Sequence, residues 1–270
     1  MAEAVFRDGA PCWVDVMVND VDAALEFYAE VMGWRAGERS GPEFGGYAMW
    51  FADGVPVAGV GPVNGDYPPS WTVYVGTTDL DATVARASSV GGQVLAPAMT
   101  IGPLGRMAVL ADPAMAAFGL WEAADFGGFA RIGDSGFPAW FDVQSTDVEA
   151  TRAFLRELFG YTESVPEPAP PMADYRQLDV DGQPVLGSMG AFAVPVSFWM
   201  TYFASADVDG AVGRATAAGG TLLHGPEDTP FGRMATLADP EGAVFSLSSV
   251  PDRYASAAAL ALVTRLSIDS

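Results

Sequence analysis

The sequence has no lysine, one histidine and one cysteine among its 270 residues. Without lysine there is no Schiff-base catalysis, no lysine-bound pyridoxal phosphate and no P-loop. A single cysteine, Cys12, excludes an internal disulfide, a cysteine-ligated iron–sulfur cluster and a structural zinc knuckle. A single histidine, His224, excludes metal centres that take two or three histidines from one chain.

Positive charge is also scarce, because 13 arginines stand against 34 acidic residues and leave a net charge of −21. Such a chain repels nucleic-acid phosphate and anionic lipid, and its field attracts cationic ligands. The first ten residues lack the basic start and apolar run of a signal peptide. The longest apolar run, 255–263, is far below the roughly 20 residues that cross a bilayer and predicts a C-terminal helix. The lone cysteine fits a reducing compartment. We therefore expect a cytoplasmic protein with neither nucleic-acid nor membrane partners.

The chain repeats itself at a shift of 127 residues. Residues 13–34 and 140–161 share nine of 22 positions, and residues 102–118 and 229–245 share 11 of 17. Two matches at one shift indicate two homologous domains. We place them at 1–126 and 134–270, joined by the glycine-rich stretch 125–138.

Each half carries an internal rhythm of one strand, one helix and further short strands. In the first half, an alternating strand at 13–18 precedes a helix at 20–32, which Gly33 is suited to end. A second strand at 71–76 and a second helix at 79–90 restart the pattern. Each domain is thus predicted to be βαβββ twice, an α+β fold.

The motif LADP-x-x-A-x-F, which occurs at 110–118 and again at 237–245, carries a family resemblance together with the strand–helix pattern of 13–34. The chain resembles the vicinal oxygen chelate superfamily, which includes glyoxalase I, extradiol dioxygenases and bleomycin resistance proteins. It is similar to the tandem two-domain actinobacterial members. The resemblance implies a cupped mixed sheet in each domain, but it does not specify the activity.

In metal-using relatives, His, Glu or Gln on the concave strands hold an ion. The resemblance places those positions at Trp13, Thr72 and Gly119 in the first domain, and at Trp140, Met200 and Ser246 in the second. A fourth position falls within 57–61 or 185–189, where no His, Glu or Gln occurs. Such residues cannot supply the three or four donors that a transition metal needs. We therefore predict no metal and no cofactor.

Strand alternation places Asp15 and Asp142 on the concave side of their sheets. Each carboxylate is suited to hold a cation, or to act as a general base if burial raises its pKa. The alternative is a structural aspartate bonded to an arginine or to backbone amides, because an unmatched charge in an apolar cup is costly. His224 is a third candidate base, but an exposed histidine in a surface loop without chemistry is the favoured interpretation.

Aromatic residues recur on the same side. Trp13 and Trp140 offer flat surfaces for stacking, or fill the core. Tyr74 and Tyr202 face inward, where their hydroxyls can bond a ligand or find backbone partners. The residues predicted to bind a ligand are Trp13, Asp15, Met17, Thr72, Tyr74, Trp121, Trp140, Asp142, Met200 and Tyr202. Trp50 and Met49 are further candidates to reach a cup, whereas Arg106 and Arg233 are expected in structural ion pairs.

These features lead to a working hypothesis of metal-independent binding of a flat, largely apolar natural product or antibiotic, with or without a positive charge, such as an aromatic polyketide. The role would be sequestration, or carrying the product of a tailoring enzyme, which is then a partner. The alternative is a cofactor-free enzyme that does acid–base chemistry (isomerase, lyase or hydroxylase-like tailoring) on such a compound. A metal-dependent glyoxalase or dioxygenase is a third reading. Both a monomer with internal pseudo-symmetry and a homodimer are compatible with the repeat.

Overall fold

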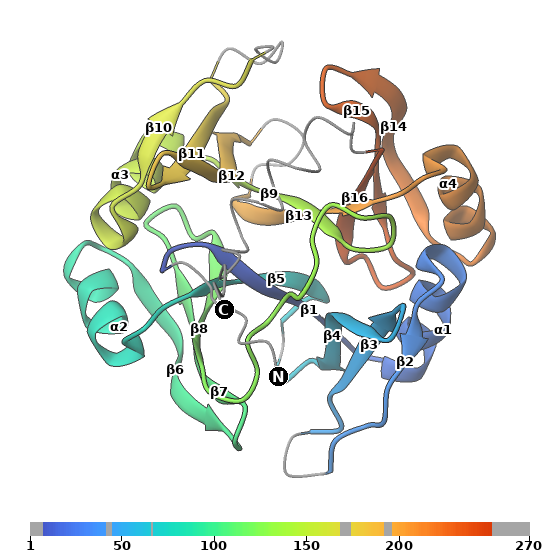
Figure 1. Ribbon diagram of the computed structural model, residues 1–270, viewed down its shortest axis with the longest axis horizontal. Helices are drawn as coiled ribbons and strands as arrows, with labels where there is room; N and C mark the ends of the chain where they lie inside the picture. The colour runs from blue at the N-terminus through green and yellow to red at the C-terminus, as the bar shows by residue number, and fades with distance from the viewer. Residues whose placement is uncertain (1–7, 42–44, 66, 168–173, 192–195, 250–270) are drawn as a thin grey trace, which may run out of the picture.

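The computed structural model describes residues 8–41, 45–65, 67–167, 174–191 and 196–249. These residues form two mixed sheets of eight strands each, and each sheet carries two helices (Figure 1). The prediction of an α+β fold with two βαβββ units per domain is confirmed. The helix predicted at 255–263 lies outside the described residues. No helix within the described part of the chain is long and apolar enough to cross a membrane.

The first domain runs from β1 to β8. Its elements are β1 (Pro11–Val18), α1 (Val21–Met32), β2 (Arg35–Ala36), β3 (Ala48–Ala52), β4 (Val55–Pro62), β5 (Ser70–Gly76), α2 (Leu80–Ser89), β6 (Gln93–Ile101), β7 (Gly105–Ala111) and β8 (Ala117–Ala123). The strands follow the order β2-β3-β4-β1-β5-β8-β7-β6 across the sheet. The two leading strands, β1 and β5, therefore meet at its centre.

The second domain repeats this order. Its elements are β9 (Pro138–Ser145), α3 (Val148–Phe159), β10 (Thr162–Ser164), β11 (Arg176–Val180), β12 (Gln183–Gly190), β13 (Phe198–Ala204), α4 (Val208–Ala217), β14 (Thr221–Thr229), β15 (Gly232–Ala238) and β16 (Val244–Ser248). Its sheet runs β10-β11-β12-β9-β13-β16-β15-β14, so that β9 and β13 are central.

The helix boundaries follow the local signals of the sequence. Asp20 caps α1 by accepting a hydrogen bond from the Ala23 backbone N–H at 3.0 Å, and Gly33 ends the helix at φ 72°. Asp147 and Gly160 do the same for α3. A side-chain oxygen at the N-cap satisfies an orphan amide, and glycine adopts the left-handed conformation without a Cβ penalty.

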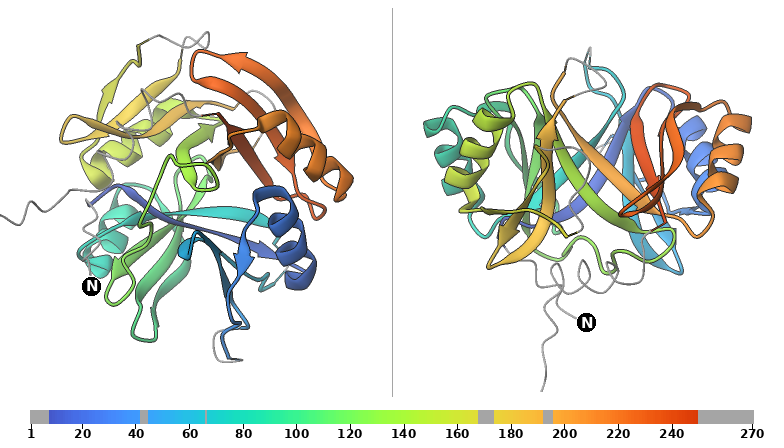
Figure 2. Two further views of the ribbon diagram at one scale, coloured as in Figure 1. Left: turned by 45° about the vertical axis from the view of Figure 1, so that its right-hand side comes forward. Right: turned by 90° about the horizontal axis from the view of Figure 1, so that it is seen from above.

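Each helix of the first domain packs against a helix of the second domain. Helix α1 lies beside α4, and α2 lies beside α3, so the first unit of each domain faces the second unit of the other (Figures 1 and 2). Figure 2 shows these helix pairs on opposite flanks, with the strands between them. Strands β5 and β13 contact each other in the middle. The resulting core is continuous across the domain boundary.

The aspartates of the LADP motif link the domains. Asp239 accepts hydrogen bonds from its own turn, at Glu241 N (3.0 Å) and Ala243 N (2.9 Å), and from the Tyr28 hydroxyl of α1 at 3.2 Å. Asp112 likewise accepts from Ala116 N at 2.8 Å and from the Thr151 hydroxyl of α3.

A cluster of buried aromatic rings fills the interface near Tyr28. The Tyr28 ring lies 5.1 Å from Trp50 and 5.3 Å from Trp71, and Trp71 Nε1 donates to the Tyr28 hydroxyl at 2.9 Å. Trp50 is fully buried in this cluster. The interpretation of Trp50 as a cup residue is therefore wrong, because the residue packs against the rings at the domain interface.

Candidate functional site

The concave face of the first sheet brings several predicted residues together. In the strand register, Asp15 of β1 lies between Gly59 of β4 and Thr72 of β5. Trp13 lies opposite Tyr74. Because side chains alternate along a strand, Trp13, Asp15 and their partners share one face. We call this group, completed by Tyr47, the first cup.

Asp15 is buried in the first cup and only loosely bonded. The Tyr47 hydroxyl reaches its Oδ2 at a long 3.4 Å, and Trp13 Nε1 donates to the Tyr47 hydroxyl at 3.1 Å. Oδ1 is buried and makes no hydrogen bond within the described residues. Burial raises the pKa of Asp15 to about 7, while the hydroxyls of Tyr74 and Tyr47 oppose the rise. A carboxyl with this pKa exchanges its proton near neutral pH.

The concave face of the second sheet forms a matching second cup. Asp142 of β9 lies between Gly187 and Met200, and Trp140 lies opposite Tyr202. Asp142 Oδ1 accepts hydrogen bonds from Trp140 Nε1 and from the Tyr175 hydroxyl, both at 2.9 Å. Burial raises the pKa of Asp142, and hydrogen bonds from Tyr202, Tyr175 and Trp140 oppose the rise. This carboxylate is well satisfied.

Two tyrosines that were not among the predicted site residues, Tyr47 and Tyr175, complete these clusters. Each directly precedes a strand and reaches over a glycine of the next strand. A Cβ built at Gly59 would lie 1.6 Å from the Tyr47 hydroxyl, and one at Gly187 would lie 2.2 Å from the Tyr175 hydroxyl. A signal was present, because the pattern Y-x5-D-G-x-P-V-x-G occurs at 47–59 and again at 175–187. That repeat has a shift of 128, one residue more than the shift of 127 that relates the longer matches.

The positions that correspond to metal ligands hold other groups. In the first cup the Tyr74 ring occupies the space beside Gly119, where a Cβ would lie 2.1 Å from a ring carbon. In the second cup the Ser246 hydroxyl lies 3.4 Å from the Met200 sulfur. The described residues contain no group of three His, Cys, Asp or Glu side chains that could hold a metal ion. The metal implied by the family resemblance therefore does not fit these side chains.

The linker between the domains covers part of the first cup. Phe126 packs edge-on against Trp13 with ring centroids 4.8 Å apart, and Phe129 lies 5.6 Å from the same ring. Trp121 Nε1 donates to the Phe126 carbonyl at 2.9 Å. Trp13 is consequently only 5% exposed. The Met17 sulfur and the Tyr47 ring meet over Gly61, each within 3.2 Å of a Cβ built there, and both side chains are half-buried.

The remaining polar candidates lie outside both cups. His224 was assigned to a loop, which is wrong, because it lies in the edge strand β14 and pairs with Glu227 at 2.9 Å on the surface. Arg106 pairs with Asp81 of α2 at 2.9 Å. Arg233 pairs in the same way with Asp209 of α4. These arginines tie a strand to the start of a helix.

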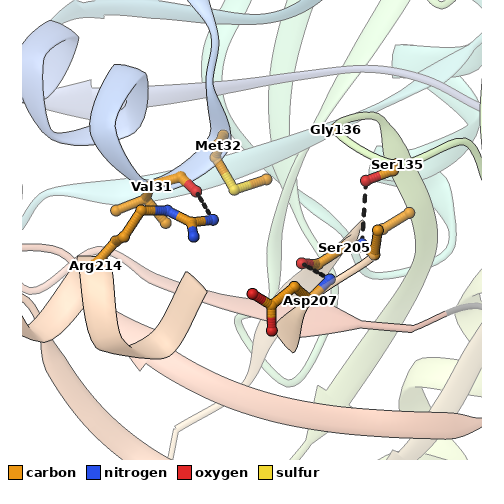
Figure 3. A pocket seen from close by; sticks show the side chains of 9 residues that line it. Val31, Met32, Ser135, Gly136, Ser205, Asp207 and Arg214 are labelled. Atoms are coloured by element: carbon orange, nitrogen blue, oxygen red, sulfur yellow. Dashed lines mark hydrogen bonds between the residues drawn. The ribbon is translucent and has the colours of Figure 1, made fainter. Parts of the chain in front are cut away.

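One cavity, of about 160 Å³, lies at the seam between the domains (Figure 3). Its lining comes from the end of α1, the linker and the start of α4, and includes Met32, Ser135 and Asp207. Arg214 donates to the Val31 carbonyl at 3.1 Å across it, as Figure 3 shows. None of the predicted site residues lines this cavity. Its polar groups bond to one another and hold the domains together.

The fold and the repeated cups place the chain in a known class. The family model of the Glyoxalase/Bleomycin resistance protein/Dioxygenase superfamily matches residues 12–120 and 138–247, and the chain belongs to this superfamily. Among its relatives is the glyoxylase-like protein CFP32 of Mycobacterium tuberculosis, 36% identical over 90% of this chain and 95% of that protein. The anthracycline biosynthesis protein DauV of Streptomyces sp. (strain C5) is also 36% identical, over 94% of this chain and 98% of that protein.

Solved structures share the fold at low sequence identity. The Mn(II)-bound glyoxalase of Novosphingobium aromaticivorans has a TM-score of 0.64 at 16% identity, over 92% of this chain and 84% of that one. The 2,3-dioxygenase LapB of Pseudomonas sp. KL28 has a TM-score of 0.62 at 13% identity, over 89% of this chain and 92% of that one. At such identities the likeness concerns the architecture alone.

The raised pKa of Asp15 predicts a pH-dependent stability. Between about pH 4 and pH 7 the folded chain keeps a proton on Asp15 that the unfolded chain has lost, so stability falls as the pH rises through this range. The Asp15→Asn variant should lose this share of the pH dependence, which is about 4 kcal/mol at most. Urea unfolding at pH 5 and pH 8 measures it. Asp22→Asn, at an exposed ion pair with Arg39, is the control and should retain the wild-type slope.

Proposed function

We propose that the chain binds a flat, largely apolar natural product without a metal, and that shape, aromatic stacking and carboxylate charge provide the binding. The observation that carries the proposal is the pair of largely buried Asp–Trp–Tyr–Tyr clusters, in which Trp13 and Trp140 stand at positions that correspond to metal ligands in metal-using relatives. An aromatic cup with a few placed polar groups is the usual form of a small-molecule site. The cups lie on the concave faces of both sheets.

The chemistry of the lining favours a cationic aromatic compound. Trp13, Tyr47 and Tyr74 surround a carboxyl group, and aromatic faces next to a carboxylate are suited to a ring that carries an amine. The net charge of −21 draws cations toward the protein. The relative named as an anthracycline biosynthesis protein fits this class, because an anthracycline combines fused planar rings with an amino sugar. Sequestration, or delivery from a tailoring enzyme in the cytoplasm, is the role we propose.

Binding without metal is directly testable. The protein is treated with a chelator, dialysed and titrated by calorimetry with an anthracycline that carries an amino sugar. We expect binding with a Kd of about 1 µM or tighter, unchanged by added Mn²⁺, Zn²⁺ or Fe²⁺. Binding that appears only after a stoichiometric divalent ion is restored would contradict the proposal. Bovine serum albumin, a non-specific binder of aromatic compounds, provides the comparison.

A second function, cofactor-free acid–base catalysis, is favoured by one observation. Asp15 is buried in an aromatic cup with a pKa of about 7, which suits a general base at neutral pH. Tyr74, on the neighbouring strand, can donate a hydrogen bond to an enolate oxygen. Mass spectrometry of the anthracycline after incubation in D₂O separates the two functions. Deuterium incorporation or a changed mass supports the enzyme, and an unchanged compound supports the binding protein.

A further inference from the structure

The two cup aspartates occupy equivalent positions but differ in how their oxygens are satisfied. Asp142 accepts two hydrogen bonds of 2.9 Å on Oδ1, from Trp140 and Tyr175, and Tyr202 adds a third donor to the carboxylate. Asp15 accepts from the Tyr47 hydroxyl on Oδ2 at a long 3.4 Å, and Tyr74 adds a second donor to the carboxylate. Its Oδ1 is buried without a hydrogen bond in the described part of the chain. The same four residue types therefore surround both aspartates, but of the two carboxyl groups it is Asp15 that keeps a buried oxygen without a donor.

The difference arises from the neighbouring tryptophans. In the second cup Trp140 Nε1 donates directly to Asp142 and also to Tyr175, so one indole supports both groups. In the first cup Trp13 Nε1 donates to Tyr47 at 3.1 Å, and no bond from Trp13 to Asp15 is present. The Trp13 ring packs against Phe126 and Phe129 of the linker. Among the described residues, no such pair of aromatic rings packs against Trp140. Trp13 thus contacts the linker rings and donates to Tyr47, and Asp15 Oδ1 has no donor.

An unsatisfied buried oxygen carries a free-energy cost, because it has lost its hydrogen bonds to water without gaining others. Such an oxygen can take its missing hydrogen bond from an ordered water, an ion or a group of a ligand. The rings of Trp13, Tyr47 and Tyr74 stand around Asp15, and a cation among aromatic faces gains further electrostatic stabilisation. Met17 and Tyr47, which are half-buried, lie at the rim beside it, and a flexible methionine side chain yields to an entering group at little cost.

We propose that Asp15 Oδ1 is the binding point for a protonated amine of the ligand, and that Asp142 is a structural counterpart whose hydrogen bonds are already made. This inference rests on the proposed function, and it assigns the amine to the first cup. The planar rings of the ligand would then lie toward the rim formed by Met17, Tyr47 and Thr72. A neutral ring system without an amine has no partner for this oxygen.

Matched variants of the two aspartates test the assignment. Calorimetry measures wild type, Asp15→Asn and Asp142→Asn with an anthracycline that carries an amino sugar, and with its neutral aglycone. We expect Asp15→Asn to weaken binding of the amine form at least about tenfold, the effect of one lost charge-assisted bond, and to change aglycone binding less than about twofold. Asp142→Asn should change either affinity by less than about twofold. A tenfold loss in Asp142→Asn, or an equal loss of both compounds in Asp15→Asn, would overturn the assignment.

The pH dependence of binding gives a second readout. The groups that face Asp15 are the hydroxyls of Tyr47 and Tyr74, whose pKa values burial raises well above 10, and the buried Cys12 thiol near Tyr74, whose pKa burial also raises. These groups stay neutral, so affinity for the amine form should rise between pH 5.5 and pH 8 as Asp15 loses its proton. Asp15→Asn should remove this rise, and Asp142→Asn should retain it. A rise that persists in Asp15→Asn would overturn the assignment.

A measurement without ligand keeps the two proposals apart. At pH 8, Asp15→Asn removes a buried charge that has one free oxygen and should raise the melting temperature, whereas Asp142→Asn removes a charge with its donors in place and should lower it. If wild type binds neither compound, the proposed function is wrong. The comparison of melting temperatures then still shows whether the two carboxylates differ in how well their oxygens are satisfied. Equal loss of stability in both variants would then show that Asp15 is as well satisfied as Asp142.

Discussion

Replacing Arg152 by alanine is expected to destabilise the protein by about 3–5 kcal/mol, the cost of breaking a buried charged network. Arg152 lies on the inner face of α3 with a side chain only 4% exposed. Its Nε donates to the Ser188 hydroxyl at 2.9 Å, and its Nη2 donates to the Ser188 carbonyl at 3.1 Å and to the Asp174 carbonyl. Its removal takes these donors away from Ser188, which is fully buried, and from the Asp174 carbonyl. Urea unfolding followed by tryptophan fluorescence measures the loss.

Arg156→Ala is the matched control on the same helix. Arg156 is exposed and pairs with Glu163 at 3.1 Å. Exposed ion pairs contribute little, so we expect a loss below about 1 kcal/mol. Arg152→Leu copies the first domain, which has Leu25 at the corresponding position, and should still lose most of the stability because leucine offers no donor. Similar losses in Arg152→Ala and Arg156→Ala would show that the buried network contributes little.

The Arg152 network also determines where Tyr175 lies. The Asp174 carbonyl that Arg152 holds directly precedes Tyr175, and Asp174 Oδ2 accepts from Gly190 N at 2.7 Å. The turn that presents the Tyr175 hydroxyl to Asp142 is therefore fixed from the helix side of the sheet. The first domain has leucine there, and its Tyr47 makes the longer bond to Asp15. The sequence difference between Leu25 and Arg152 thus accompanies the difference between the cups.

Gly119→Ala should destabilise the protein by about 2–4 kcal/mol, in the range of overpacking in a dense core. The added Cβ would lie 2.1 Å from a ring carbon of Tyr74 and 2.7 Å from the carbon where the ring begins, so the whole side chain must move. Tyr74 is buried, and it lies between Trp13 and Gly119 in the sheet register. Thermal unfolding by calorimetry measures the effect.

Gly213→Ala provides the opposite case. Gly213 lies within α4, and a Cβ there meets nothing within 4 Å. Alanine is the better helix former, so this variant should gain about 0.5–1 kcal/mol. Ser246, the counterpart of Gly119, already carries a Cβ, so the second cup cannot hold Tyr202 over its strand in the same way. A Gly119→Ala variant as stable as Gly213→Ala would show that Tyr74 moves aside freely.

The sequence predicted the fold through local and repeated signals. The matches at a shift of 127, the Asp20 cap and Gly33 stop of α1, and the alternation of β1 are properties of short segments or of their repetition. They placed Asp15 and Trp13 on the concave face, and the structure has them in one register with Tyr74. Tyr47 was missed, because its segment is related to its counterpart by a shift of 128, and because its contact with Asp15 joins two segments 32 residues apart.

The sequence by itself determined the presence of two repeats, the succession of strands and helices along each unit, and the residue types on the inner face of the first strands. These features depend on helix caps, strand alternation and internal repeats, which are properties of the chain itself. The tertiary structure alone decided which acceptors are satisfied: Asp142 accepts from Trp140 and Tyr175, whereas Trp13 donates to Tyr47 and leaves Asp15 Oδ1 without a donor. It also decided that Asp112 and Asp239 join the domains. Hydrogen-bond distances depend on how separate strands and linkers pack, and two cups of equal composition can therefore differ in chemistry.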